Sequence, residues 1–168
     1  MGAETNHYLA DPNYVALSAS VRENPFSMTE RGIMADWCDE HDLSRHAELL
    51  RGGSIPLTIF EELAVSVLGG CNFAPATWDK KFAQSLVAKM NEQRERKDVA
   101  YLTVKQWLWL WIMLRRYRRS VSHDKVKAEA EARYNRCLEL LDLKHLKPIE
   151  RRRRKATDDR PCFLEWTE

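Results

Sequence analysis

Eight consecutive apolar residues, Trp107 to Leu114, constrain the fold of this chain more than any other feature of its sequence. The run is far below the roughly 18 apolar residues that indicate a membrane-spanning helix, so we expect it inside a folded domain. Thr103 and Gln106 precede it at the spacing of a capping box, which favours a helix over a strand. A helix that is apolar on both sides belongs either at the centre of a bundle or under a partner.

The three tryptophans of this helix separate into two groups when its residues are placed at about 100° intervals. Trp107 and Trp111 fall on the broad apolar face, and we expect both of them in the core. Trp109 points nearly the opposite way, beside Lys105 and Arg116. Aromatic and arginine side chains dominate binding interfaces. Trp109 and Lys105 are therefore candidates for a surface that contacts nucleic acid or a protein partner.

Four arginines follow the apolar run directly and surround a tyrosine: Arg115, Arg116, Arg118 and Arg119. Guanidinium groups bind phosphates and carboxylates bidentately, which the ammonium group of lysine cannot do. Positive side chains at the end of a helix also interact favourably with the helix dipole. The cluster is therefore predicted either to bind an anionic partner or only to stabilise the helix.

A second basic cluster is the strongest electrostatic signal of the sequence, with five consecutive cations: Arg151, Arg152, Arg153, Arg154 and Lys155. Such a run cannot belong to a core, and it predicts a phosphate-contacting tail, a docking segment for an acidic protein or a nuclear address. A solvated tail without a partner is the alternative. Phe163, Leu164 and Trp166 follow, and apolar residues at a terminus indicate docking onto the domain or onto a partner.

Charge is distributed unevenly along the chain, although the formal net charge is only +2. Residues 1–100 contain ten Lys and Arg against fifteen Asp and Glu, a net charge of −5. Residues 101–168 contain seventeen and ten, a net charge of +7. This asymmetry indicates either a face that binds an anionic partner or two halves that neutralise each other within one fold.

Capping and periodicity signals predict an all-α fold, a single compact bundle of about six helices. Residues 1–26 contain Pro12 and Pro25 and show no sustained period, so we expect an irregular N-terminal arm. Residues 27–147 are expected to form the helical domain, and residues 148–168 a basic and aromatic C-terminal tail. No strand pair is predicted. Six residues are expected to begin helices: Ser27, Ser44, Thr58, Thr77, Thr103 and Ser122.

The sequence favours a binding protein over an enzyme. Its glycine pairs resemble helix stops rather than a phosphate-binding loop, and its carboxylates are scattered over helix surfaces. Cys38 and His41, with His46 nearby, support a weaker alternative, a metal-dependent enzyme. No second pair completes a zinc set, so no metal, cofactor or catalytic residue is predicted. With no secretory signal or membrane span, and with four widely spread cysteines, we expect a cytoplasmic protein with reduced thiols.

Within residues 78–107, packing and capping positions follow one another in a recognisable order: Trp78, Phe82, Ser85, Leu86, Leu102, Thr103, Lys105 and Gln106. This segment resembles a helix pair of small phage and plasmid proteins, often near replication or recombination functions. It covers about 30 of the 168 residues, and no catalytic residue belongs to it. The resemblance implies a mobile-element protein that works close to nucleic acid.

These observations lead to two functional hypotheses. The first is a non-enzymatic, nucleic-acid-associated helical protein from a phage or mobile element, whose arginine clusters contact the phosphates of DNA or RNA with low sequence specificity. The second is a protein-interaction factor, an inhibitor or a subunit, that docks on a larger nucleic-acid-processing complex. In that case Trp109, the arginines, Phe163 and Trp166 are the anchors. The oligomeric state is left open.

Overall fold

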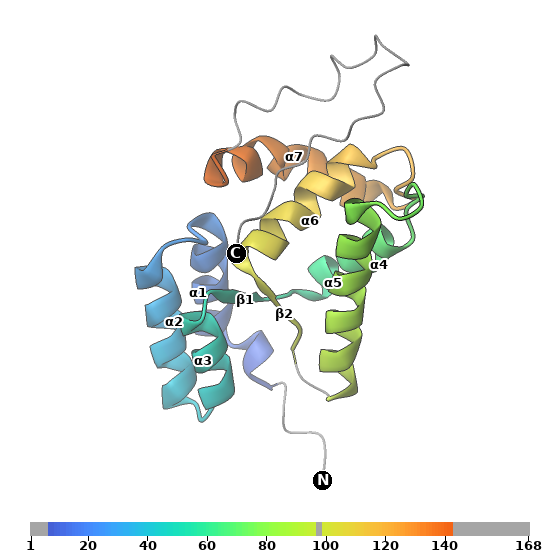
Figure 1. Cartoon of the computed structure of the whole chain (residues 1–168). Coiled ribbons are helices and arrows are strands. Elements are labelled where there is room, and N and C mark those ends of the chain that lie inside the picture. Colours follow the sequence, from blue (N-terminus) through green and yellow to red (C-terminus); the bar gives the residue numbers. More distant parts are fainter. Residues whose placement is uncertain (1–6, 97–98, 143–168) are drawn as a thin grey trace.

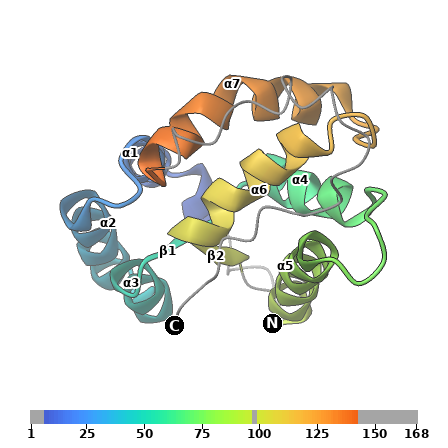
Figure 2. The ribbon, with the colours of Figure 1, turned by 45° about the horizontal axis from the view of Figure 1, so that its top comes forward.

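The computed structural model describes residues 7–96 and 99–142. Helices α1, α2 and α3 pack together on one side, α4 and α5 lie on the other, and α6 and α7 lie across the two groups (Figure 1, Figure 2). Two short strands lie between the groups. The described elements, in chain order, are the 3₁₀ helix η1 (His7–Ala10), α1 (Pro12–Glu23), α2 (Met28–Glu40), α3 (Ser44–Arg51), β1 (Ser54–Pro56), α4 (Ile59–Gly69), α5 (Trp78–Glu95), β2 (Tyr101–Thr103), α6 (Val104–Arg116) and α7 (Asp124–Leu140).

Helix α6 lies at the centre of the bundle, as its apolar run predicts. Eight of its thirteen residues are buried, and it contacts α4, α5, α7 and both strands. Trp107 and Trp111 are both buried, which confirms their prediction as core residues. Large aromatic side chains contribute more buried area than other residues, so these two tryptophans form much of the contact between α6 and its neighbours.

The predicted irregular arm over residues 1–26 is wrong for its described part, because residues 12–23 form helix α1. Asp11 is the N-cap, and its carboxylate accepts hydrogen bonds from the backbone N–H groups of Asn13 and Tyr14. Pro12 occupies the first helical turn, where its missing N–H costs nothing. The buried face of α1 includes Ser18 as well as apolar residues, which obscures the helical period in the sequence.

Two three-residue strands also depart from the sequence prediction, which contained no strand pair. Strands β1 and β2 are antiparallel, with Ile55 opposite Leu102 and Pro56 opposite Tyr101. Gly53 precedes β1 with a φ of +83°, a conformation that glycine adopts without strain. Strands this short show no alternation of apolar and polar residues. Pro56 also disfavours a strand, because proline has no backbone N–H to donate to a neighbouring strand. The pair nevertheless joins α3 to the start of α6.

Most predicted helix starts are confirmed in their capping contacts. The sequence indicates three capping boxes, and two of them, Thr58 with Glu61 and Thr103 with Gln106, form in both directions. In the third, Ser27 accepts from the backbone N–H of Glu30, and within the described residues the Glu30 side chain makes no return bond. The Thr77 side chain caps α5. The last helix differs by one residue, because the ring of His123, and not the hydroxyl of Ser122, accepts from the first turn of α7. With α1 included, the described residues contain seven α-helices where about six were expected.

Candidate nucleic-acid interface

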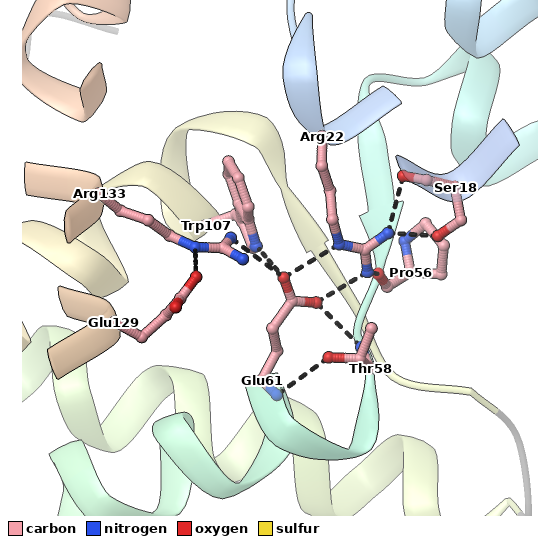
Figure 3. Close-up of polar contacts among 8 residues, drawn as sticks. All are labelled: Ser18, Arg22, Pro56, Thr58, Glu61, Trp107, Glu129 and Arg133. Atoms are coloured by element: carbon pink, nitrogen blue, oxygen red, sulfur yellow. Dashed lines mark hydrogen bonds and ion pairs between the residues drawn. The ribbon is translucent and has the colours of Figure 1, made fainter. Parts of the chain in front are cut away.

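A buried carboxylate, Glu61, holds together the helices that position the basic end of α6 (Figure 3). Its side chain belongs to α4, and the residue is only 1% exposed. Arg22 of α1 donates to both carboxylate oxygens, from Nε at 3.0 Å and from Nη2 at 2.7 Å. Trp107 of α6 donates its indole N–H to Oε1 at 2.9 Å. One carboxylate thus connects three helices that are distant in sequence.

The local capping box fixes the orientation of this carboxylate. The backbone N–H of Thr58 donates to Glu61 Oε2 at 2.9 Å, and the Thr58 hydroxyl accepts from the Glu61 backbone N–H at 3.1 Å. Arg22 uses its other donors on the backbone carbonyls of Ser18 and Pro56, at 2.9 and 2.5 Å. A buried ion pair is tolerated only when its remaining polar atoms are hydrogen-bonded, and both partners meet that condition here.

Arg133 brings α7 to the same carboxylate. Its Nη1 lies 3.6 Å from Glu61 Oε1, and its Nε contacts Glu129 one turn earlier in α7. The guanidinium lies over the rings of Trp111 and Trp107, at 4.6 and 5.4 Å from their centroids. Cation–π contacts of this kind strengthen when they are partly desolvated. Helix α7 is therefore held against α6 by charge as well as by packing.

The charge of Glu61 predicts a loss of stability on acidification. Burial by itself raises the pKa of Glu61, but the hydrogen bonds and charge of Arg22, with the N–H groups of Thr58 and Trp107, outweigh it and lower the pKa. The folded state therefore binds this proton less readily than the unfolded state, whose pKa is about 4.3. The contribution of Glu61 is complete above that pH and is lost as the pH falls through the folded pKa.

We therefore expect the difference in unfolding free energy between the wild type and Glu61→Gln to be largest near neutral pH and to shrink below about pH 4. Urea unfolding at a series of pH values measures this difference, and the neutral variant provides the control in which this group does not titrate. A difference that is the same at neutral and at acidic pH would contradict the assignment of Glu61 as the charged centre of the network.

The basic turn, which we define as residues 115–127, joins α6 to α7. It carries six cations: Arg115, Arg116, Arg118, Arg119, Lys125 and Lys127. Helix α6 ends at Arg116, so the arginines surround the negative end of the helix dipole. Val121 is buried within the turn and anchors it to the core. The predicted arginine cluster is therefore brought together with two lysines of α7.

Two carboxylates from other helices neutralise part of the basic turn. Glu131 of α7 contacts Arg115, and its Oε2 lies 3.9 Å from Nη1 of Arg118. Asp79 of α5, which is buried, lies 3.3 Å from Nη1 of Arg116 and accepts a hydrogen bond from the Tyr117 hydroxyl at 2.5 Å. Arg115 is almost fully covered and lies over the Tyr134 ring. Arg115 and Arg116 therefore have structural partners.

Positive charge remains on the basic turn after these pairs are counted. Within the described residues, the six cations face Asp79, Glu131 and Asp124, which leaves a net charge of +3. Arg119 and Lys125 are both exposed. An open depression of about 500 Å³ lies on this surface and is lined by Arg118, Arg119, Asp124, Lys127, Ala128 and Glu131. The turn thus presents excess positive charge around a shallow concavity.

The structure separates the other two predicted site residues of α6 from this turn. Lys105 is exposed in the first turn of the helix, about 15 Å along the axis from Arg115. Trp109 is half-buried and meets Trp78 of α5 edge to face, with ring centroids 5.9 Å apart. Trp109 therefore packs between helices, and the more exposed aromatic residue is its neighbour.

Trp78 is not predicted as a site residue, yet the residue after it in α5 contacts the basic turn. It is 39% exposed and stacks on Phe82 at 4.9 Å between ring centroids. The next residue in α5, Asp79, contacts Arg116. In the sequence, Trp78 begins the apolar stripe of its helix, which favoured packing as its role. Only the position of α5 against the end of α6 reveals the exposure of Trp78.

Several predicted site residues lie outside the described part of the chain. They are the five cations of the second basic cluster, Arg151, Arg152, Arg153, Arg154 and Lys155, together with Phe163 and Trp166. Their role in binding stays a prediction.

The candidate metal ligands take part in other contacts. Cys38 is fully buried, and His41 stacks on Trp37 with ring centroids 3.9 Å apart. Nδ1 of His46 lies 2.7 Å from the hydroxyl of Tyr101. Across residues 7–96 and 99–142, no three His, Cys, Asp or Glu side chains are grouped so that they could hold a metal ion.

Comparison with protein-family models, with curated proteins and with solved structures finds no match to this chain. The resemblance of residues 78–107 to helix pairs of phage and plasmid proteins therefore stays a prediction. Among the described helices, none combines the length and the apolar character needed to cross a membrane.

Proposed function

We propose that the protein is a non-enzymatic, nucleic-acid-associated helical protein that contacts phosphates through the basic turn and the cluster from Arg151 to Lys155. The observation that carries this proposal is the net charge of +3 that remains on the basic turn once its acidic partners among the described residues are counted. Because phosphate contacts carry no sequence information, we expect low sequence specificity.

The cations of the turn do not contribute equally to this proposal. Arg115 and Arg116 are held by Glu131 and Asp79, so they shape the turn. The pairs of Arg118 and Lys127 with carboxylates are longer, at 3.9 Å, and exposed. Exposed ion pairs of this kind contribute about 0–1 kcal/mol, so a phosphate can replace the carboxylate at little cost. Arg119 and Lys125 add exposed charge beside them.

Nucleic-acid binding is expected to depend steeply on salt and on the exposed cations of the turn. In Arg119→Gln/Lys125→Gln, the slope of log K against log salt should fall by about 1.4–1.8, because each lost phosphate contact removes about 0.7–0.9. Fluorescence anisotropy with labelled single- and double-stranded DNA and RNA, at about 50 and 200 mM salt, measures this slope.

The matched control removes two cations at the far end of α5. Arg94→Gln/Arg96→Gln changes the net charge equally, and both arginines are exposed and paired with glutamates. This control should leave the slope nearly unchanged. Equal effects of the two double variants would indicate general attraction rather than a site, and absence of binding at low salt would exclude the proposal.

The alternative, a protein-interaction factor, is favoured by one observation. Trp78 is partly exposed, directly before Asp79, which contacts the basic turn, and Trp109 of α6 packs against Trp78. Tryptophan and arginine together are typical of interface anchors. Absence of salt-dependent nucleic-acid binding would favour this alternative over the proposed function.

A further inference from the structure

An apolar groove lies where α1, β1 and the start of α4 meet. Its volume is about 530 Å³, and its walls are largely apolar, formed by Leu9, Tyr14, Val15, Ala19, Leu57 and Ile59 with neighbouring residues. Ile59 is 87% exposed and Val15 is 54% exposed. Contiguous exposed apolar surface of this kind marks an interaction site in soluble proteins.

The chain leaves the described structure close to this groove. Helix α7 ends at Leu140, beside the C-terminal end of α1, where Arg136 donates to the backbone carbonyl of Glu23 at 3.4 Å. Figure 1 and Figure 2 show the end of α7 next to α1, in agreement with this hydrogen bond. Leu140 and Arg22 line one small cavity, and Arg22 also lines the groove. The groove is thus no further from the end of α7 than the length of α1, about 18 Å.

The length of chain beyond α7 is sufficient to reach the groove. Residues 143–162 are 20 residues, and a chain of that length reaches at most about 66–72 Å, well beyond the roughly 18 Å length of α1. The segment that follows is Phe163-Leu164-Glu165-Trp166, which contains the two aromatic residues of the chain beyond Tyr134. Attachment to the same chain gives such a segment an effective concentration in the millimolar range, so modest apolar contacts suffice for docking.

We propose that residues 163–166 of the same chain dock in this groove, with Phe163, Leu164 and Trp166 covering Val15 and Ile59. The inference goes beyond the proposed function and does not depend on nucleic-acid binding. Docking would hold the cluster from Arg151 to Lys155 beside α1 and α7 rather than leave it free of the domain. A partner that competes for the groove would displace residues 163–166. The cluster from Arg151 to Lys155 would then be free to contact phosphates.

The test uses the full chain with a nitroxide label on Cys162. The other three cysteines are buried, and burial raises the pKa of the Cys38 thiol to about 11 and that of the Cys137 thiol to about 12. Their slow reaction directs the label to Cys162, and Cys162→Ser reports any labelling elsewhere. Methyl signals of Val15 and Ile59 should be broadened several-fold more than that of Val121, in the basic turn.

Matched variants separate docking from accidental proximity. The triple variant Phe163→Ala/Leu164→Ala/Trp166→Ala should lose the selective broadening, and Ile59→Ser should weaken it. Ile33→Ser changes an exposed isoleucine of α2 that does not line the groove, so it should retain the broadening. Both isoleucines are exposed, so both variants should fold, which the dispersion of their spectra confirms.

Three outcomes would overturn the proposal. Broadening that persists in the triple variant would show that the segment is not the occupant. A mixed sample contains chains that carry the nitroxide and other chains that carry the isotope. Broadening that appears only in this sample would show that the segment docks in the groove of a second copy. Absence of selective broadening in the wild type would leave the groove to a separate partner.

Discussion

Replacing Glu61 with Gln is expected to lower the free energy of unfolding by about 3–5 kcal/mol, the usual cost of breaking a buried ion pair. The substitution keeps the size of the side chain and its oxygen, but it removes the charge that balances Arg22 and Arg133. Arg22 is then left largely buried, with its donors directed at a neutral amide. Its desolvation is no longer offset by attraction, and this uncompensated charge is the main cause of the loss.

Glu62 provides a matched control one residue away in the same helix. Its carboxylate pairs with Arg94, which is half exposed at the surface. The Glu62 side chain is 17% exposed, but its partner is half in solvent, so Glu62→Gln should cost clearly less than Glu61→Gln, about 1 kcal/mol. Urea unfolding of both variants at neutral pH measures the contrast. Similar small losses would mean that the network around Glu61 contributes only specificity, and that packing alone holds the four helices together.

Phe substitutions at Trp107 and Trp111 are expected to differ, although the two tryptophans lie one turn apart in α6 and are both buried. Trp107 donates its indole N–H to Glu61 at 2.9 Å. The indole N–H of Trp111 is buried and has no hydrogen-bond partner among the described residues. Both changes remove a similar volume, so the packing loss is comparable. Trp107→Phe should cost about 1.5–3 kcal/mol more, the contribution of a hydrogen bond to a charged group.

The comparison is made by urea unfolding under identical conditions, with the slopes checked for equality so that both variants are treated as two-state. Each variant serves as the control for the other. If Trp111→Phe proved equally or more costly, the hydrogen bond to Glu61 would contribute nothing beyond packing, and the role of Trp107 would be that of a core residue alone.

Local signals made much of this fold predictable. The capping boxes at Thr58 and Thr103 form as their spacing predicts, because both partners lie within one turn of helix. The central position of α6 follows from its apolar run, because a helix that is apolar on all sides is buried only when other helices pack around it. Asp11 and Pro12, a cap and a first-turn residue, are compatible with helix α1, but two prolines and the absence of a sustained period over residues 1–26 predict an irregular arm instead.

The site was less predictable because its contacts join residues that are far apart in sequence. Local spacing indicates Glu61 only as the capping-box partner of Thr58, although Arg22 and Trp107, 39 and 46 positions away, make it the centre of a buried network. The four arginines near Tyr117 were recognised as a group. Their pairing with Asp79 and Glu131 depends on how α5 and α7 pack, and no local pattern reports that packing.

The strand pair has a consequence for the speed of folding. Pairing of Ser54 with Thr103 encloses α4, α5 and the segments around them in one loop. The entropy of closing a loop grows only with the logarithm of its length, so closing this long loop costs only slightly more stability than closing a shorter one. It does raise the average sequence separation of native contacts, and folding slows as that separation grows. The chain should therefore fold more slowly than a bundle whose helices contact only their neighbours in sequence.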